Sequence, residues 1–181
     1  MAPVTHLLFS WLSTVRLFNN RRERAIVTLA GVAPDLDGLG IIVDKFNGSS
    51  NYYFSFHHHL GHSLFAALII STLAMLLSKV QRAKVFIASF LLVQVHILFD
   101  VIGSKSPDGF QWPIHYLSPV NDEFVLVWSG QWYLNSWQNI LFTFCLVCLA
   151  TYYAVTKKLT VFEIINDNLN NAAIRLIEKY K

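Results

Sequence analysis

Apolar positions along the chain form long runs that no charged side chain interrupts. Residues 60–78, 85–99 and 124–156 contain no Asp, Glu, Lys or Arg, and Trp137–Val155 is the most apolar part of the third run. A helix that crosses a membrane needs about 20 mostly apolar residues, a length that the first and third runs reach. The second run reaches it if its helix continues through Asp100 to Gly103. The pattern therefore predicts at least three spanning helices.

Two weaker apolar segments come earlier in the chain. Residues 3–18 are interrupted by Arg16, and residues 25–43 contain the sequence APDLDG, which predicts an irregular turn. We expect both segments to cross the membrane as well, although the short first one has a re-entrant or interfacial position as its alternative. The predicted fold class is an all-α, multi-pass transmembrane helical bundle.

Basic residues lie at one end of each predicted helix. They form three clusters, Arg21–Arg24, Lys79–Lys84 and Lys157–Lys158. Because Lys and Arg concentrate in the cytoplasmic loops of membrane proteins, one path places all three clusters in the cytoplasm. The connections 44–56 and 104–136 then lie outside.

The composition agrees with a membrane protein. Apolar residues make up 54% of the 181 residues and charged residues only 14%, whereas a soluble domain carries about a quarter of charged residues. A soluble bundle of fully buried helices would need more polar and charged residues on its surface than this chain has. The same figures exclude a disordered chain or a coiled coil, and we expect no nucleic-acid partner. Cys145 and Cys148 lie within an apolar run, so we expect them to act as small hydrophobes, without a redox or zinc role and without a disulfide.

The chain becomes amphipathic after Lys158. Apolar residues recur at helical spacing through residues 159–181, with Asn and Asp residues on the other faces. We expect a membrane-embedded region over residues 1–158 and an amphipathic helix on the cytoplasmic surface over residues 159–181. A helix that binds a protein partner is the alternative.

Ionisable residues inside the apolar segments are the candidate functional groups, because such residues are costly in a membrane. His96 and Asp100 are four residues apart on a predicted helix, so both project from one face. Paired in this way they could bind a metal ion, as the two histidines of an HExxH helix do, or form a buried hydrogen bond between helices.

Two further groups carry the same kind of residue. The sequence FHHHLGHS places His58 and His62 four residues apart if a helix has begun there, which suits a metal site or a pH sensor. Asp35 and Asp37 in APDLDG could bind a cation or cap a helix N-terminus. On the predicted path these residues, together with His6, His96, Asp100 and His115, all fall on the outer side. This agreement favours a metal site.

The order of these motifs resembles a known family. An N-terminal THLLF, a segment ending in PDLD, an HHxLGHS cluster, an HxxFD helix and a following WPIxYLSP are similar to the membrane-bound metal-dependent hydrolases, also labelled LexA-binding, inner-membrane-associated hydrolases. More distantly, the order is similar to zinc-dependent phospholipase C. The resemblance covers about residues 2–120 and implies a protein of a prokaryotic cytoplasmic (inner) membrane. It also implies a metal-site set of His6, Asp35, Asp37, His57 or His58, His62, His96 and Asp100. Many members have Arg-Gly where this chain has His58 and His59, so the ligand among the three consecutive histidines stays open.

These observations predict a metal-dependent hydrolase that acts on a lipid or lipid-linked phosphoester at the outer face. One to three divalent ions are expected, with zinc favoured over manganese and iron. Asp37 is expected to be a ligand or a base, and His115 to be a ligand or a substrate-binding group of the catalytic site. Four tryptophans, Trp112, Trp128, Trp132 and Trp137, are candidates for an interfacial rim. The alternative is a metal site without catalysis, either structural or sensing, or a pathway through the membrane.

Overall fold

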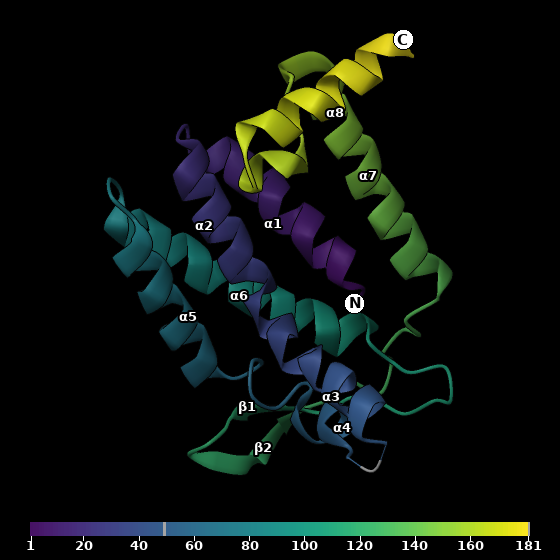
Figure 1. Ribbon diagram of the computed structural model, residues 1–181. Helices are drawn as coiled ribbons and strands as arrows, with labels where there is room; N and C mark the ends of the chain where they lie inside the picture. Colours follow the sequence, from purple (N-terminus) through teal and green to yellow (C-terminus); the bar gives the residue numbers. More distant parts are fainter. Residues whose placement is uncertain (49, 181) are drawn as a thin grey trace.

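Helices account for most of the chain, as the hydrophobic pattern predicts. The computed structural model describes residues 1–48 and 50–180. Along the chain the helices are α1 (Pro3–Leu17), α2 (Arg21–Val32), the 3-10 helix η1 (Ala33–Leu39), α3 (Gly40–Asn47), α4 (Tyr52–Phe56), α5 (Leu64–Leu77), α6 (Arg82–Gly103), α7 (Trp137–Lys157), the 3-10 helix η2 (Val161–Ile164) and α8 (Asp167–Lys179) (Figure 1). Two short strands, β1 (Ile114–Leu117) and β2 (Asn121–Leu126), form an antiparallel hairpin that the all-helical prediction did not include.

Three helical stretches of the described chain are long and apolar enough to cross a membrane. They are Arg21–Asn47, Arg82–Gly103 and Trp137–Lys157. The expected spanning helix over residues 60–78 is wrong in its extent, because α5 begins only at Leu64 and has 14 residues. Residues 57–63 form turns instead, and the Ser63 hydroxyl caps α5 by accepting a hydrogen bond from the Ala66 amide at 3.1 Å.

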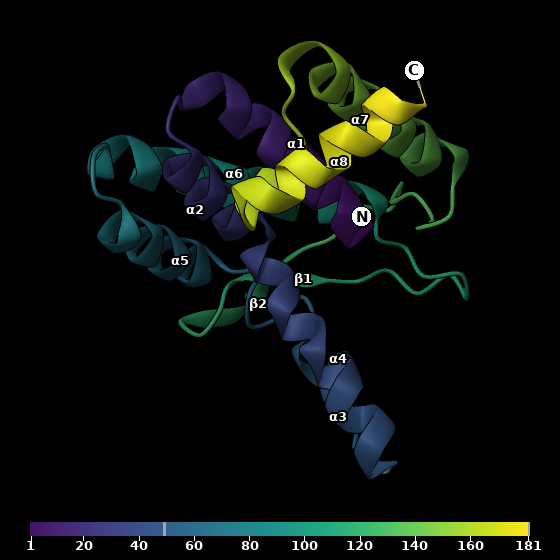
Figure 2. The ribbon, with the colours of Figure 1, turned by 45° about the horizontal axis from the view of Figure 1, so that its top comes forward.

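The first of these stretches runs through α2, η1 and α3 without a break. The predicted irregular turn at APDLDG is a 3-10 helix, so the chain tightens there but keeps its direction. Figure 2 shows α3 and α4 side by side, projecting from the bundle as an arm. Asp44 ties the two together, because its carboxylate accepts hydrogen bonds from the Tyr52 and Tyr53 amides at 2.7 and 2.8 Å.

Small residues let the helices of the bundle approach one another closely. Ala30 of α2, Ala74 of α5 and Ala88 of α6 are buried in one apolar cluster. A Cβ atom at Gly31 would lie 2.3 Å from the Ser10 hydroxyl oxygen of α1 and 3.3 Å from Leu92 of α6, so only glycine fits between them. Close packing of this kind holds helices together where lipid removes the hydrophobic driving force.

The basic clusters meet at one end of the bundle. Arg22 of α2 donates to the Leu77 carbonyl at 3.1 Å, and Lys84 of α6 donates to the Leu17 carbonyl at 2.5 Å. At the same end, the buried carboxylate of Glu163 pairs with Arg24 and accepts a hydrogen bond from the Trp11 indole at 2.9 Å. The C-terminal segment is therefore anchored at the basic end.

The C-terminal segment forms an amphipathic helix, shorter than the predicted one. It divides into η2 and α8, whose exposed apolar residues include Phe162, Leu169 and Leu176. Lys181, the last residue of the predicted helix, lies outside the described residues.

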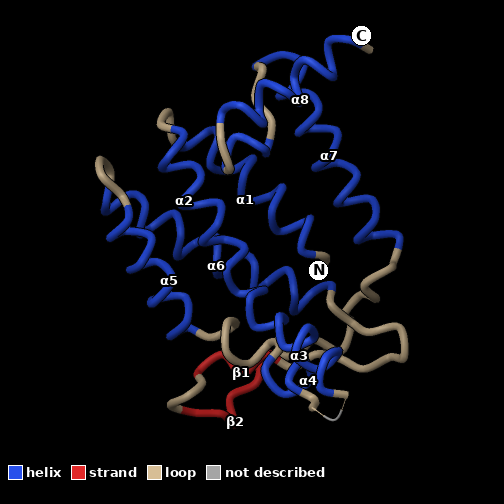
Figure 3. Tube along the Cα trace, viewed as in Figure 1, coloured by secondary structure: helices blue, strands red, loops and turns tan. Residues whose placement is uncertain are grey.

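The hairpin and several connecting loops lie together at the opposite end, below the start of α1 (Figure 3). The hairpin packs against the bundle through Ile114, which is buried with Ala67 of α5 and with Val93 and Ile97 of α6.

Candidate metal centre

The end of the bundle opposite the basic clusters collects histidine and aspartate side chains from four parts of the chain. α1 contributes His6, η1 contributes Asp35, the turn before α5 contributes His58 and His62, and α6 contributes His96 and Asp100. Most of these side chains are almost completely buried; His62, for example, has no exposed surface. The structure thus brings together residues that lie up to 94 positions apart in the sequence.

The first group consists of His6, Asp35, His96 and Asp100, whose potential ligand atoms all lie within 4.8 Å of one another. His96 Nε2 is 3.2 Å from Asp100 Oδ2 and 3.5 Å from Asp35 Oδ1. His6 Nε2 is 3.1 Å from Asp100 Oδ1. Two ligands of a tetrahedral zinc ion with bonds of about 2.1 Å are about 3.4 Å apart, so these spacings match a shared ion.

The second group consists of His58, His62 and Asp100. His62 Nε2 lies 3.3 Å from Asp100 Oδ2, and the rings of His58 and His62 have their centres 4.5 Å apart. Because Asp100 belongs to both groups, its carboxylate lies where it could bridge two neighbouring ions. Paired metal sites of this kind are common in enzymes that cleave phosphoesters.

Several of these ligand atoms have no hydrogen-bond partner although they are buried. The unpartnered atoms include Asp35 Oδ2, His58 Nδ1, His62 Nε2, His96 Nε2 and Asp100 Oδ2. A buried polar atom without a partner costs about 1–3 kcal/mol, so a cluster of them requires an explanation. A cation bound among them would satisfy these atoms together, whereas a simple network of histidine–aspartate hydrogen bonds leaves them unpaired.

The other ring nitrogens of two candidate ligands are held by hydrogen bonds. His62 donates from Nδ1 to Asp37 Oδ2 at 2.8 Å, and His96 donates from Nδ1 to the Gly31 carbonyl at 2.8 Å. Each bond places the proton on Nδ1 and leaves Nε2 free, which is the arrangement that metal-binding histidines usually show. The close approach of helices at Gly31 therefore also positions His96.

Asp37 and His57 form a pair beside the two groups. Asp37 accepts a hydrogen bond from His57 Nδ1 at 2.9 Å through its second oxygen, in addition to those from His62 and the Gly61 amide. Asp35 and Asp37 thus contact histidines, and η1 has no side-chain cap, so the helix-cap alternative is wrong for both.

The buried carboxylate of Asp100 attracts positively charged groups. Besides its histidine neighbours, it contacts the α-amino group of Met1. Burial lowers the pKa of His58 well below its ordinary value, so its ring is neutral and can offer a lone pair to a metal. Burial alone would also lower the pKa of His62, but the neighbouring carboxylates of Asp100 and Asp37 raise it.

A cavity of 420 Å³ gives access to the clusters. Its lining includes Asp35, His57, His58, Tyr53 and Trp112. The Trp112 ring lies against those of His57 and His58, at centre distances of 5.3 and 5.6 Å. Tyr53 stacks on His57 at 4.7 Å. The sequence marked Trp112 only as part of an interfacial rim, and it gave no signal for Tyr53, which reaches the site because the α3–α4 arm folds back.

The three consecutive histidines point to different partners. His58 joins the second group, His57 bonds to Asp37, and His59 lies 3.3 Å from the Ser118 hydroxyl. The three residues diverge because the backbone of His58 has φ 65°, a left-handed conformation that histidine adopts more readily than most residues. The condition for a helical spacing of His58 and His62 is therefore not met, because α5 begins only at Leu64.

His115, a predicted catalytic residue, lies outside both groups. It is on β1, donates from Nδ1 to the Asp122 carbonyl at 2.9 Å and lies against the His59 ring at a centre distance of 4.7 Å. The structure thus places His59 and His115 together as a separate pair beside the candidate metal centre.

The chain matches a known protein family. The family model described as "YdjM inner membrane protein" matches residues 1–161, which include every candidate ligand. Neither curated proteins nor solved structures give a significant match. The family match confirms the resemblance that the motifs indicated.

Proposed function

Because this chain belongs to the YdjM inner membrane protein family, and because its buried histidines and aspartates form two adjoining groups, we propose that it is a membrane-embedded metal-dependent hydrolase. Its substrate class is a lipid or lipid-linked phosphoester, and its site faces the outer side of the membrane. The observation that carries the proposal is the set of buried, unpartnered ligand atoms around the shared carboxylate of Asp100.

The residues fit divalent ions, most simply zinc. His6, Asp35, His96 and Asp100 would hold one ion, and His58, His62 and Asp100 a second. The donors are all nitrogen and oxygen, which suits zinc, manganese or iron. Bound there, such ions supply Lewis acidity, which activates water and stabilises negative charge on a phosphoryl oxygen.

The protein's own contribution to the reaction comes from the Asp37–His57 pair. Asp37 orients His57 by accepting its Nδ1 proton, as a carboxylate orients the histidine of other acid–base pairs. The other ring nitrogen, Nε2, is then free to take a proton from water in the cavity and to return it to the leaving group. Trp112 and Tyr53 pack on the His57 ring and limit its rotation. His57 is thus the proposed acid–base residue, and Asp37 its orienting partner.

Metal analysis of the purified protein tests the first half of the proposal. The wild-type protein should contain zinc, manganese or iron. Asp100→Ala should lose most of this metal, and His62→Ala, which removes a ligand of one group, should lose part of it. His115→Ala is the matched control, because it removes a histidine outside both groups and should retain the metal. Equal metal content in all four proteins would refute the metal centre.

Turnover of phospholipid and of a soluble phosphodiester by the metal-loaded protein tests the second half. His57→Ala should keep its metal and lose about 10²–10⁴-fold in turnover, the usual contribution of an acid–base group. A wild-type protein that binds metal but cleaves none of these substrates would refute the hydrolase and favour a structural or sensing metal site.

Cysteine labelling tests the outward orientation. In a background with Cys145 and Cys148 replaced by alanine, an impermeant thiol reagent added to intact cells should label Asp108→Cys and not Lys158→Cys. Asp108 is an exposed residue of the loop beside the site, and Lys158 ends α7 at the basic end. The reverse labelling would place the site in the cytoplasm.

A further inference from the structure

A continuous apolar furrow runs between α2–η1 and α5. Two hollows of 530 and 460 Å³ form it and share Ala33, Leu36 and Ile70 in their linings. One hollow extends along α5 to Leu77 at the basic end, and the other reaches Asp37 beside the metal centre. We refer to the two hollows together as the furrow.

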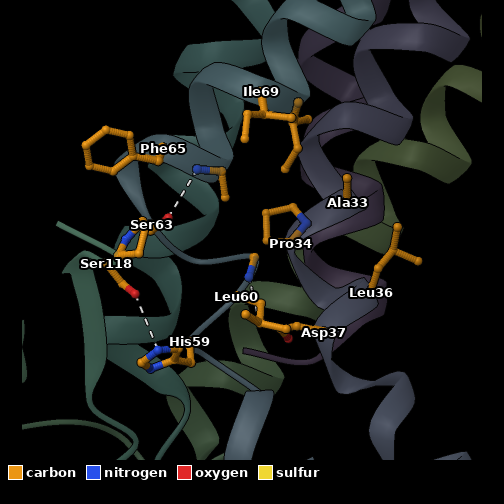
Figure 4. A pocket seen from close by; sticks show the side chains of 14 residues that line it. Ala33, Pro34, Leu36, Asp37, His59, Leu60, Ser63, Phe65, Ile69 and Ser118 are labelled. Carbon is orange, nitrogen blue, oxygen red and sulfur yellow. Dashed lines mark hydrogen bonds between the residues drawn. The ribbon is translucent and has the colours of Figure 1, made fainter. Parts of the chain in front are cut away.

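The walls of the furrow are almost entirely apolar and open to the surroundings. Figure 4 shows Ile69 and Phe65 of α5 on one side and Ala33, Pro34 and Leu36 on the other. Leu36 and Ile69 are 63% and 61% exposed, so in a membrane they face hydrocarbon rather than protein. A lipid chain is the component of the bilayer that fits between two such walls.

The furrow ends in polar groups only at the site. Asp37, His59 and Ser118 line this end (Figure 4). His59 is partly exposed and lies 3.3 Å from the Ser118 hydroxyl, 4.0 Å from Asp122 Oδ1 and against His115. The oxygens of Asp37 already accept hydrogen bonds from His57, His62 and the Gly61 amide. His59 and Ser118 are therefore the groups that can donate hydrogen bonds to a phosphate at this end.

Gly61 allows the furrow and the site to lie next to each other. A Cβ atom at this position would be 2.3 Å from the Pro34 carbonyl oxygen, so the turn before α5 can pass this close to η1 only with glycine. The same approach lets the Gly61 amide reach Asp37 at 3.0 Å. One contact thus forms the floor of the furrow and fixes the orienting carboxylate.

The length of the furrow suits one lipid chain. The 14 residues of α5 rise about 21 Å at 1.5 Å per residue. One leaflet contributes about 15 Å to the hydrocarbon core. A lipid chain that is long enough to span one leaflet is therefore shorter than the α5 wall and fits along the furrow.

We propose that the furrow binds one acyl chain of a membrane phospholipid and places its phosphate at His59 and Ser118, next to the metal centre. A lipid would then enter sideways from the bilayer, between α2–η1 and α5, without passing through water. That the bound lipid is also the substrate rests on the proposed hydrolase function, whereas the binding site itself does not.

Photolabelling tests the binding site independently of activity. The full-length protein is reconstituted in vesicles of phosphatidylethanolamine and phosphatidylglycerol that contain a phosphatidylglycerol with a photoreactive acyl chain. Labelled peptides are then identified by mass spectrometry. We expect labelling to concentrate on the furrow walls around Leu36 and Ile69, above the level on lipid-facing residues elsewhere.

Two variants of equal bulk sharpen the test. Ile69→Trp fills the furrow, whereas Leu76→Trp adds the same side chain on α5 outside the furrow, at a residue of nearly equal exposure (61% and 62%). Ile69→Trp should lower labelling of Leu36 about tenfold, which corresponds to about 1.4 kcal/mol of lost binding. Leu76→Trp should leave it unchanged.

The outcomes separate the two proposals. Selective labelling that Ile69→Trp abolishes supports the acyl-chain site even if no substrate is cleaved. Labelling spread evenly over the lipid-facing surface, or unaffected by Ile69→Trp, overturns the site even if the protein cleaves a soluble phosphodiester.

Discussion

Asp37 is the residue whose replacement best distinguishes an orienting group from a metal ligand. It accepts three hydrogen bonds, and the two that involve histidines join it to both His57 and His62. In Asp37→Asn the amide oxygen can still accept from His62 and Gly61, but the bond to His62 changes from charge-assisted to neutral. The amide nitrogen then faces His57, where it cannot accept a proton.

The loss can be estimated from these bonds. A hydrogen bond to a charged group contributes about 1.5–3 kcal/mol and a neutral one about 1 kcal/mol, so weakening the His62 bond costs about 0.5–2 kcal/mol. Each 1.4 kcal/mol is tenfold in affinity, so Asp37→Asn should bind zinc about tenfold more weakly. Asp37→Ala removes the acceptor altogether and should approach the 100-fold loss typical of outer partners of metal-binding histidines.

The measurement is zinc affinity of the detergent-purified protein, obtained by competition with a chromogenic chelator. Asp44→Asn is the matched control, because Asp44 lies on the same helical stretch and its carboxylate accepts the Tyr52 and Tyr53 amides instead of contacting a candidate ligand. Wild-type affinity in Asp37→Asn would refute the orienting role. A loss as large as that of His62→Ala would show that Asp37 binds the metal directly.

Three further outcomes are expected. Asp100→Asn should lower the metal content more than His58→Ala does, because Asp100 belongs to both ligand groups and His58 to one; equal losses in elemental analysis would argue against a shared carboxylate. Removing metal with a chelator should lower the melting temperature, and restoring zinc should reverse this change, because the buried ligand atoms otherwise lack partners. A melting temperature that does not change when metal is removed would contradict a bound metal ion. Glu163→Gln should destabilise the protein by about 3–5 kcal/mol in chemical denaturation, because it leaves Arg24 buried without its counter-charge; a loss below about 1 kcal/mol would mean that the pair is solvated.

The sequence predicted the candidate site where helical spacing alone determines geometry. His96 and Asp100 lie within a long apolar run that could only be a helix, so their common face followed from the four-residue spacing, and the structure confirms it. The positions of the basic clusters likewise identified the end of the bundle where ligands should gather. Both inferences rest on the positions of residues along the sequence and need no knowledge of contacts between distant segments.

The turn before α5 could not be predicted in the same way. Its path depends on the contact between Gly61 and the Pro34 carbonyl and on the left-handed backbone of His58, both of which are set by packing against η1. For that reason three adjacent histidines with identical chemistry acquire three different partners. The β1–β2 hairpin was not predicted for a related reason. Its short strands are stabilised by contacts of Ile114 with α5 and α6.

The lengths of the short helices determine how deep the candidate site lies. α1 has 15 residues and α5 has 14, so they rise about 22 and 21 Å, less than the hydrocarbon core of about 30 Å. Both are tied to the basic clusters at one end, so their other ends stop short of the opposite surface. Polar groups at such a depth are stable only when protein surrounds them, which agrees with the nearly complete burial of His6, His58 and His62. A phosphoester held at the polar end of the furrow would leave water behind, and every electrostatic contact made with it would be stronger in the low dielectric.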